Sequence, residues 1–324
     1  MRLAAPLLLA LAMQPVMACT ITSTANISLG SKTSFDARAA ASNAGSGGSG
    51  IACPAILGLL SNQYIFLTVD SLSSVLTNAV TGDTIAFTMA TTPGGSPLAV
   101  GTSGNLAAGG LLNLAPSTGD IALFASLGAA GNVAAGTYTG TLVLRWHYAT
   151  CANISAVGIC IGGWTRSTGI NESCLLGLCT LNQGTLPGAG VAVTVTVTLT
   201  ITKDCRFSAD NVDFGSAPFV QSFNPVVGNL RITCTKGTTY SVGLSAGGAP
   251  SGGRRRMSSG LNRLEYDVYR PGNTLWTSTQ RVDQATPASG SAAEVFPYEA
   301  RIYTDQATPP PGTYTDSLII DVVF

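Results

Sequence analysis

Alternating apolar and polar residues recur along most of the chain and predict short β-strands. The clearest alternation is at residues 191–202, VAVTVTVTLTIT, where every odd position is Val, Leu or Ile and every even position is Ala or Thr. Shorter β-branched or aromatic runs, separated by Gly, Ser, Pro and Asn, occur at residues 64–71, 83–91, 120–126, 240–246, 264–269 and 298–304. Strands this short, with no helical period of useful length between them, predict an all-β fold of immunoglobulin-like β-sandwiches.

Two parts of the chain follow one plan. CTITSTANISLGS at residues 19–31 parallels CRFSADNVDFGS at residues 205–216, and GTYTGTLVLRWHY at residues 136–148 parallels GTYTDSLIIDVVF at residues 312–324. Such an internal repeat indicates two copies of one structural unit. We therefore predict a leader at residues 1–18, a first domain at residues 19–202 and a second domain at residues 203–324.

The repeat has one unequal end. After the shared motif the first copy continues for 54 residues and finishes on the alternating strand 191–202, whereas the second copy stops at residue 324. A sandwich without its last strand has an open apolar groove and unpaired edges. About five apolar side chains from another polypeptide would contribute roughly 8–15 kcal/mol of gross burial at ~1.5–3 kcal/mol each, which is comparable to the stability of a domain. We predict that the second domain lacks its last strand and accepts one from a partner along Tyr314, Leu318, Ile320, Val322 and Phe324.

The first 18 residues, MRLAAPLLLALAMQPVMA, have the features of a secretory signal peptide. Arg2 precedes a short apolar run, and Ala18 provides the small residue expected before a cleavage site. The apolar run is too short to span a bilayer. A lipid on Cys19 is the alternative, but it would leave seven cysteines, an odd number for an exported protein.

Eight cysteines in an exported chain predict disulfides formed in an oxidising compartment. Cys19–Cys53 and Cys205–Cys234 are the natural pairs, because each joins the first strand of one repeat to its second strand. The pairing among Cys151, Cys160, Cys174 and Cys179 is left open. A zinc site at Cys160, Cys174 and Cys179 is the competing interpretation, and it is disfavoured because the spacings match no zinc pattern. No metal and no cofactor are expected.

The charge balance argues against a nucleic-acid partner. Net charge is zero and 10% of the residues are charged, whereas nucleic-acid binding needs a basic surface. His147 is the single histidine and has no partnered nucleophile, so we expect no enzymatic activity. The basic run RRRM at residues 254–257 is expected to be solvated, with contact to an acidic chaperone or subunit as the alternative.

Both halves resemble the spore-coat-U-type domain of pilins from the archaic chaperone–usher pathway. The resemblance is carried by the paired cysteines, by NISLGS and NVDFGS, by the two GTYT strands, and in the second half by RRRMSSGLNRLEYDVYR at residues 254–270. It implies a subunit that lacks its last strand. A periplasmic pilus chaperone would fill the gap, and at the outer-membrane usher the N-terminal strand of the next pilus subunit would replace the chaperone.

The resemblance also suggests a position in the fibre. A stalk subunit carries an alternating extension before its first cysteine, whereas here Cys19 is the predicted mature N-terminus. The resemblance then implies a two-domain tip adhesin, exported through the periplasm to the cell surface, that attaches to a host or abiotic surface and supports biofilm formation. A structural stalk or coat-type subunit is the alternative. A secreted hydrolase is a third possibility, supported only by abundant serines.

The predicted binding surface lies at the far pole of the first domain. Strand 191–202 ends at the second domain, so its start and the preceding loop 149–190 belong at the opposite pole, and we place loops 71–83 and 103–119 there too. Exposed apolar patches mark binding sites, although most leucines are buried in a core. The candidate contact residues are Leu72, Val75, Leu76, Leu111, Leu112, Leu114, Ile159, Ile161, Trp164, Leu175, Leu176 and Leu178.

Overall fold

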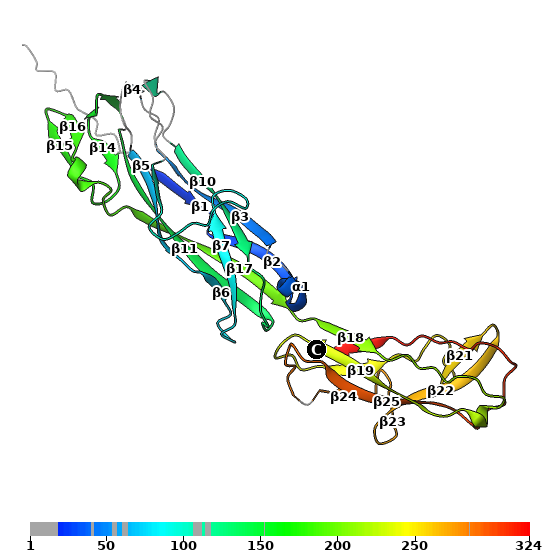
Figure 1. Cartoon of the computed structure of the whole chain (residues 1–324). Helices are drawn as coiled ribbons and strands as arrows, with labels where there is room; N and C mark the ends of the chain where they lie inside the picture. The colour runs from blue at the N-terminus through cyan, green and yellow to red at the C-terminus, as the bar shows by residue number, and fades with distance from the viewer. Residues whose placement is uncertain are drawn as a thin grey trace, which may run out of the picture.

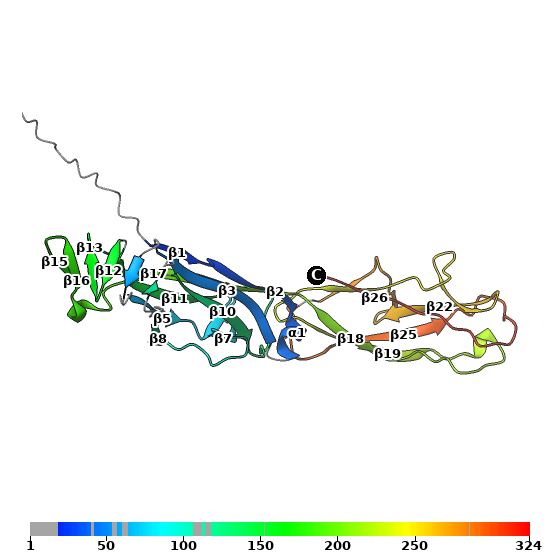
Figure 2. The same ribbon diagram turned by 90° about the horizontal axis from the view of Figure 1, so that it is seen from above.

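Two β-sandwiches follow one another along an elongated molecule (Figures 1 and 2). The structure is a computed structural model, and it describes residues 19–39, 42–53, 57–59, 64–105, 112–113, 118–151, 153–284 and 286–324. The predicted leader lies outside the described residues. Strands make up 54% and helices 4% of the structure, which confirms the all-β prediction. Within the ranges given, no helix is both long and apolar enough to cross a membrane.

The first sandwich is built on one continuous path of paired strands, β1-β3-β10-β7-β6-β11-β17-β2, which folds around a single core. Strands β14 and β5 pair with β11, and β8 pairs with β5. The bounds are β1 (Thr20–Ser23), β2 (Asn26–Thr33), β3 (Ser42–Ala52), β5 (Tyr64–Leu72), β6 (Val75–Thr77), β7 (Thr84–Ala90), β8 (Ser103–Asn105), β10 (Thr118–Leu127), β11 (Gly136–Cys151), β14 (Trp164–Arg166) and β17 (Val191–Thr202).

Strand β17 completes this sandwich. It pairs antiparallel with β11 from Gly136↔Ile201 to Trp146↔Val191, and parallel with β2, so it lies between the two. Its alternation places Val195, Val197 and Leu199 in the core, as the sequence predicts.

A separate six-stranded sheet, which we call the distal sheet, lies at the end of the first sandwich that is farthest from the second (Figures 1 and 2). Its order is β15-β16-β13-β12-β4-β9, and the helix η1 (Gln183–Thr185) follows it. The prediction that loop 149–190 belongs at the far pole is confirmed. The bounds are β4 (Leu57–Leu59), β9 (Leu112–Asn113), β12 (Ile154–Ala156), β13 (Ile159–Ile161), β15 (Glu172–Leu175) and β16 (Leu178–Leu181).

Loop 71–83 does not share that pole, so this prediction is wrong. Strand β6 pairs with β11 at Thr77↔Thr139, close to the end of β11 that faces the second sandwich. The carboxylate of Asp83 lies 2.6 Å from the ammonium of Lys236 in the second sandwich. The pole of a loop depends on which strands lie side by side, and here β5 and β6 run antiparallel to β11 toward the junction.

The second sandwich has one sheet in the order β18-β19-β25-β22-β21, with β23 paired to β22, and a smaller sheet β24-β20-β26. Its core is separate from that of the first sandwich. The bounds are β18 (Cys205–Ala209), β19 (Val226–Cys234), β20 (Ser241–Leu244), β21 (Arg255–Ser259), β22 (Asn262–Arg270), β23 (Thr274–Leu275), β24 (Val282–Asp283), β25 (Glu294–Ile302), β26 (Ile320–Val323) and the helix η2 (Val220–Ser222).

Polar contacts join the two sandwiches where β17 leads into β18. The helix α1 (Ser34–Ala39) contributes Ser34, whose hydroxyl lies 2.7 Å from that of Thr235. Arg38, from the same helix, donates to the carbonyl of Gly290 at 2.7 Å. The last residue, Phe324, also lies at this junction (Figures 1 and 2). The final strand of the second sandwich therefore runs toward the first sandwich.

Candidate functional site

The two sandwiches differ at the strand that the internal repeat equates. In the first sandwich, Tyr138, Leu142, Leu144 and Trp146 of β11 are all 0% exposed. Their counterparts in the second sandwich, Tyr314, Leu318, Ile320 and Val322, contact the core but are only half-buried. In the first sandwich β17 pairs along the edge of β11, and its side chains complete the core beside these residues. Among the residues that the structure describes, no strand pairs along the equivalent edge in the second.

Backbone pairing shows that the two faces correspond in register. The bridge Thr139↔Thr77 in the first sandwich matches the bridge Thr315↔Ser258 in the second, because Thr139 and Thr315 are equivalent in the repeat. At the other end, β26 pairs antiparallel with β20 through Leu244↔Ile320. Each residue of β17 can therefore be assigned a partner on the second sandwich.

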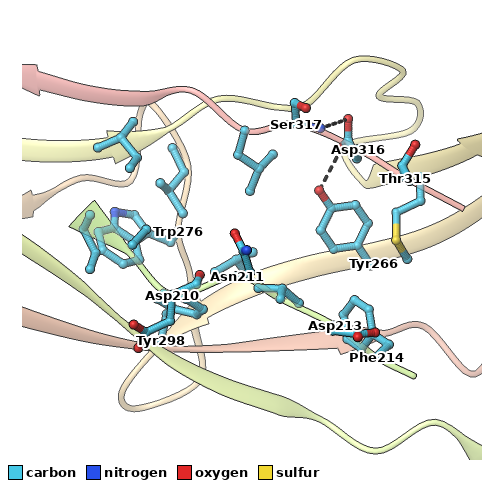
Figure 3. Close-up of a pocket in the computed structure, with 18 of the residues that line it drawn as sticks. Asp210, Asn211, Asp213, Phe214, Tyr266, Trp276, Tyr298, Thr315, Asp316 and Ser317 are labelled. Atoms are coloured by element: carbon cyan, nitrogen blue, oxygen red, sulfur yellow. Dashed lines mark hydrogen bonds between the residues drawn. The ribbon is translucent and has the colours of Figure 1, made fainter. Parts of the chain in front are cut away.

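The uncovered face lines a hollow, which we call the open groove (Figure 3). A cavity of about 650 Å³ lies between residues 209–214 on one side and residues 314–320 on the other, with Trp276 and Val268 among its apolar lining. A second cavity of about 710 Å³ adjoins it through Val212, Phe214 and Tyr314. The open groove is thus lined by apolar side chains of the core together with polar ones such as Asp210, Asn211 and Asp213.

The opposite wall of the groove matches strand β2. In the first sandwich, Ile27 and Leu29 of β2 are 1% and 4% exposed, because β17 pairs alongside. Their counterparts are Val212, which is 37% exposed, and Phe214, which is half-buried. The groove therefore has the same two walls that enclose β17 in the first sandwich.

The residues that the sequence predicted along the groove edge lie there, except for the last one, Phe324. Four of the five predicted residues contact the second core, whereas Phe324 is 52% exposed and its ring lies against Lys203 at 5.7 Å. The chain turns away from the core at this point. Phe324 therefore belongs to the junction rather than to the groove.

Beneath the groove lies a buried ion pair. Arg255 lies 2.8 Å from Asp267, and both side chains are almost fully buried. The guanidinium also donates to the carbonyls of Leu244, Ser245 and Trp276. The prediction that residues 254–257 are solvated is therefore wrong for Arg255, since β21 and β22 carry both charges into the sandwich. The buried pair fixes the end of β20 against the groove floor.

At the far pole, two hairpins of the distal sheet expose apolar side chains. Ile159, Ile161, Leu175, Leu176 and Leu178 are 37–95% exposed, as predicted for a contact surface. The sequence reasoning missed two neighbours, Ile154 and Val157, which are 52% and 76% exposed. The pattern Val-Gly at 157–158 resembles Leu-Gly at 176–177, and this similarity was the available signal.

Each hairpin turns through an apolar residue in the left-handed region. Val157 has φ 52° and is followed by Gly158 at φ 78°, whereas Leu176 has φ 53° and is followed by Gly177 at φ 80°. Two-residue hairpins with both φ values positive strongly favour Asn-Gly or Asp-Gly. A β-branched or bulky residue here is strained, at about 1–3 kcal/mol. The most exposed apolar residues thus occupy positions where local structure disfavours them.

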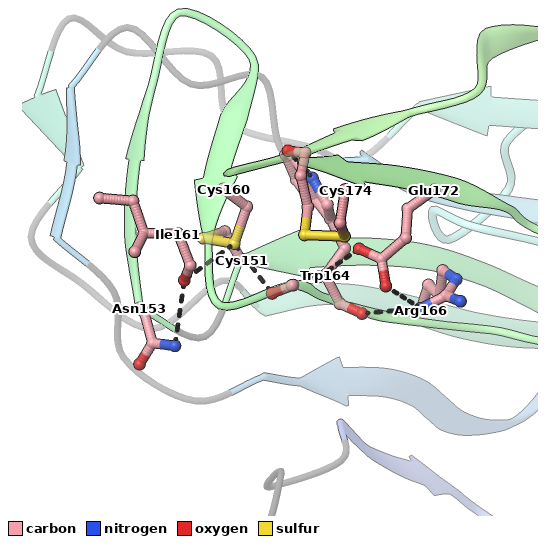
Figure 4. The surroundings of a disulfide bond; sticks show 10 residues. Cys151, Asn153, Cys160, Ile161, Trp164, Arg166, Glu172 and Cys174 are labelled. Carbon is pink, nitrogen blue, oxygen red and sulfur yellow. Dashed lines mark hydrogen bonds and ion pairs between the residues drawn. A yellow bond between two sulfur atoms is a disulfide. The ribbon is translucent and has the colours of Figure 1, made fainter. Parts of the chain in front are cut away.

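Disulfides and buried polar contacts hold the base of these hairpins (Figure 4). Cys174 and Cys179 are joined directly below the Leu175–Leu178 tip, while Cys160 of β13 is joined to Cys151 at the end of β11. These bonds settle the pairing that the sequence left open, and the predicted Cys19–Cys53 and Cys205–Cys234 bonds are also present. Because every cysteine is in a disulfide, none offers a thiolate to a metal.

Trp164 is part of this base and not of the contact surface, so that prediction is wrong. It is 4% exposed, and its indole Nε1 donates to the carbonyl of Cys179 at 3.0 Å. Glu172 accepts from the backbone N–H of Trp164 at 2.8 Å and pairs with Arg166 at 2.7 Å. The tryptophan fills a small core beneath the hairpins because its strand β14 pairs with the end of β11.

The remaining predicted contact residues do not form part of the exposed tip. Leu76 is fully buried, and Leu72 is half-buried against the first core, because both lie on strands rather than in a loop. Val75 is half-buried in β6. Leu111 and Leu114 lie outside the described residues, and Leu112 is described only as backbone of β9, which pairs with β4 in the distal sheet.

His147 behaves as a buried strand residue. Its Nε2 lies 3.3 Å from the hydroxyl of Thr68, and burial, more than any neighbouring group, lowers its pKa below the ordinary value for histidine. A neutral imidazole is therefore favoured at this position.

Comparisons with known proteins agree with the fold. Residues 191–321 match the model of the Spore Coat Protein U domain family. The fold is similar to that in a solved complex of CsuC with CsuE, a chaperone with a tip adhesion subunit from archaic chaperone-usher Csu pili of Acinetobacter baumannii. The match covers 95% of this chain and 100% of the chain in that structure, at 24% identity and a TM-score of 0.58. At this identity the likeness establishes the fold alone.

A weaker match is the CupB6 tip adhesin of Pseudomonas aeruginosa, with 11% identity, coverage of 94% of this chain and 92% of that chain, and a TM-score of 0.34. This score is too low to support an argument. A search of curated proteins gave no significant match. Residues 191–321 therefore resemble the Spore Coat Protein U domain family, and the two-sandwich fold is similar to that of the matched chain in the CsuC–CsuE complex.

Proposed function

We propose that this protein is a subunit of a chaperone–usher pilus whose second sandwich accepts a strand from another polypeptide. The open groove is the observation that carries this proposal. It has the walls that enclose β17 in the first sandwich, in the same register, but its apolar residues remain half-buried. Filling the groove would remove this apolar surface from water and pair the free edge of β26.

The direction of the groove supports a place at the end of the fibre. Strand β17 runs antiparallel to β11, so a strand in the groove would run antiparallel to β26. Since β26 points toward the junction, the incoming strand would continue out of the far end of the second sandwich (Figures 1 and 2). The body of the donating subunit would then lie on the side opposite the first sandwich, which leaves the distal sheet free.

The proposed partners follow from the same groove. In the periplasm a pilus chaperone would supply the strand, as the CsuC–CsuE complex of a chaperone with a tip adhesion subunit suggests by analogy of fold. At the outer-membrane usher, the N-terminal strand of the next pilus subunit would replace it. The protein would thus pass through the periplasm to the cell surface, with a binding and structural role and no catalysis.

The apolar tip of the distal sheet is proposed as the surface-binding site. Leu175, Leu176 and Val157 lie on hairpin ends that are fastened by disulfides, and two of the three adopt strained backbone conformations. Exposed apolar groups of this kind mark interaction sites on soluble proteins. We propose attachment to apolar abiotic or host surfaces, and through it a role in biofilm formation.

Strand acceptance can be tested on the full chain. A copy of residues 191–202 would be fused after Phe324 through a short turn, because the added strand must run antiparallel to β26. The matched control carries Ser at the odd positions of the added strand. We expect the first fusion to raise the urea midpoint of the second sandwich and to protect it from proteolysis, with no such change in the control. Equal stability of the two fusions would refute strand acceptance.

A further inference from the structure

Of the alternate residues 314, 316, 318 and 320, which repeat the core-facing positions of β11, only Asp316 is polar. Asp316 lies between Tyr314 and Leu318 on the face that lines the groove (Figure 3), where the first sandwich has Gly140. A side chain added at Gly140 would meet the side chains of Leu76 and Phe87 at 2.9 Å. In the first sandwich this position is therefore filled by apolar core, whereas in the second it holds a carboxylate.

The hydrogen bonds of Asp316 leave part of its carboxylate available. Oδ1 accepts from the backbone N–H groups of Gly248 and Ser317 at 2.8 and 2.9 Å, and Oδ2 accepts from the hydroxyl of Tyr266 at 2.8 Å. A carboxylate offers about four acceptor sites, so these bonds from the described residues use about three. The remaining acceptor site is on Oδ2, because that oxygen accepts from Tyr266 alone.

The tyrosine cannot relieve the negative charge. Burial, followed by the adjoining Asp316 carboxylate, raises the pKa of Tyr266 above the ordinary value for tyrosine, so its hydroxyl remains a donor. The other charged residues that line this cavity are Asp210, which is paired with Arg231, and Asp213. The lining contains no lysine or arginine. The charged side chains that line this cavity are therefore all carboxylates, which accept hydrogen bonds and donate none.

The register identifies the residue of an incoming strand that would face Asp316. In the first sandwich Val197 of β17 lies opposite Gly140, in a fully apolar setting. A valine in the equivalent place of the second sandwich would offer no donor to the remaining acceptor site on Oδ2. Leaving a buried charged acceptor unsatisfied is unfavourable, whereas a hydroxyl at the same position would satisfy it.

We propose that Asp316 makes the groove selective for partner strands that carry a hydrogen-bond donor, such as Thr or Ser, at the single position opposite it. The remaining inward positions, opposite Tyr314, Leu318 and Ile320, would take apolar residues. This inference rests on the proposed strand acceptance. It means that β17 itself, with Val197 at this position, is not the best strand for the second sandwich.

Thr and Val provide a matched test because they have nearly the same shape. Two peptides with the sequence of residues 191–202, flanked by lysines for solubility, would carry either Val or Thr at the seventh position. Binding to the full chain would be measured by fluorescence anisotropy, with a scrambled peptide as control. We expect the Thr peptide to bind about tenfold more tightly, which corresponds to about 1.4 kcal/mol.

The variant Asp316→Gly restores the residue of the first sandwich, and it should abolish or reverse the preference for Thr. Asp316→Asn, which keeps the shape and removes the charge, serves if the glycine variant unfolds, and it should reduce the preference at least threefold. The ratio of the two peptides cancels any general loss of stability. Equal binding of both peptides, or tighter binding of the Val peptide to the unaltered chain, would overturn the selectivity but not strand acceptance. Failure of both peptides to bind would overturn both proposals.

Discussion

Replacing Leu175 and Leu176 by Ser should abolish surface attachment while leaving the fold intact. The two side chains are 75% and 95% exposed, so each contributes little to the stability of the free protein. Surface changes of this kind usually alter the free energy of unfolding by less than about 0.5 kcal/mol. If a target surface buries both leucines, the lost contact amounts to ~3–6 kcal/mol. That difference corresponds to roughly a 10²- to 10⁴-fold loss of binding.

The assay is adhesion of piliated cells to polystyrene, with hydrophilic glass as the reference surface. Leu261→Ser is the matched control, because Leu261 is 96% exposed but lies in the second sandwich, far from the distal sheet. The control should adhere normally. Pilus amounts should be equal for all variants, since none of the changes touches the open groove.

A second substitution separates binding from folding more sharply. Leu176→Asn places a residue that tolerates positive φ at the hairpin turn, where Leu176 has φ 53°. We expect the variant to be more stable in chemical denaturation yet less adhesive, because the strain is relieved while the apolar contact is lost. Unchanged adhesion of both variants would refute the assignment of the distal hairpins as the binding surface.

Other expectations concern the interior and the junction. Arg255→Met leaves Asp267 buried without its partner and should lower the free energy of unfolding of the second sandwich by about 3–5 kcal/mol in urea titration; a change below about 1 kcal/mol would contradict the buried pair. Trp164→Ala should expose the hairpin base to proteolysis, in contrast to the leucine variants, and equal resistance would argue against its role there. Burial raises the pKa of Asp83, but hydrogen bonds and the Lys236 charge outweigh this and lower it overall. A depressed carboxyl pKa gives stability that is present above about pH 4 and lost as the pH falls further. As the pH falls below about 4, the melting temperature of the unaltered chain should therefore drop more than that of the Asp83→Asn variant. Parallel melting temperatures of the two proteins across this pH range would contradict the prediction.

Local signals in the sequence predicted the longer strands of the two sandwiches and half of the disulfides, but not the short strands β12 to β16, which lie where a loop was expected. The alternation at residues 191–202 defines which residues of β17 face the core, and the repeat relates Tyr138 to Tyr314 in the register that the structure shows. Both depend on neighbours in sequence, because side chains alternate along any strand. The pairs Cys151–Cys160 and Cys174–Cys179 could not be predicted, because four cysteines allow three pairings and the choice depends on which short strands lie side by side.

The apolar contact surface was predictable only in part, because the exposure of its residues depends on which strands pair. Most of the exposed apolar residues of loop 149–190 were identified, but no local pattern separated Leu176 at a hairpin tip from Trp164 beneath it. Loop 71–83 was assigned to the wrong pole because its place depends on β6 lying beside β11. Such pairings join residues that are distant in the chain.

The sequence by itself thus determined that the chain forms two related β-sandwiches, in which residues 136–148 of the first copy correspond to residues 312–324 of the second. Periodicity and repetition suffice for this, since each strand records its own buried face. Only the tertiary structure decided that the uncovered face is an open groove with two walls, that a carboxylate interrupts one of them, and that Val157 and Leu176, the most exposed apolar residues of the distal sheet, lie on strained turns. Those features arise where segments far apart in sequence meet, and no single segment encodes them.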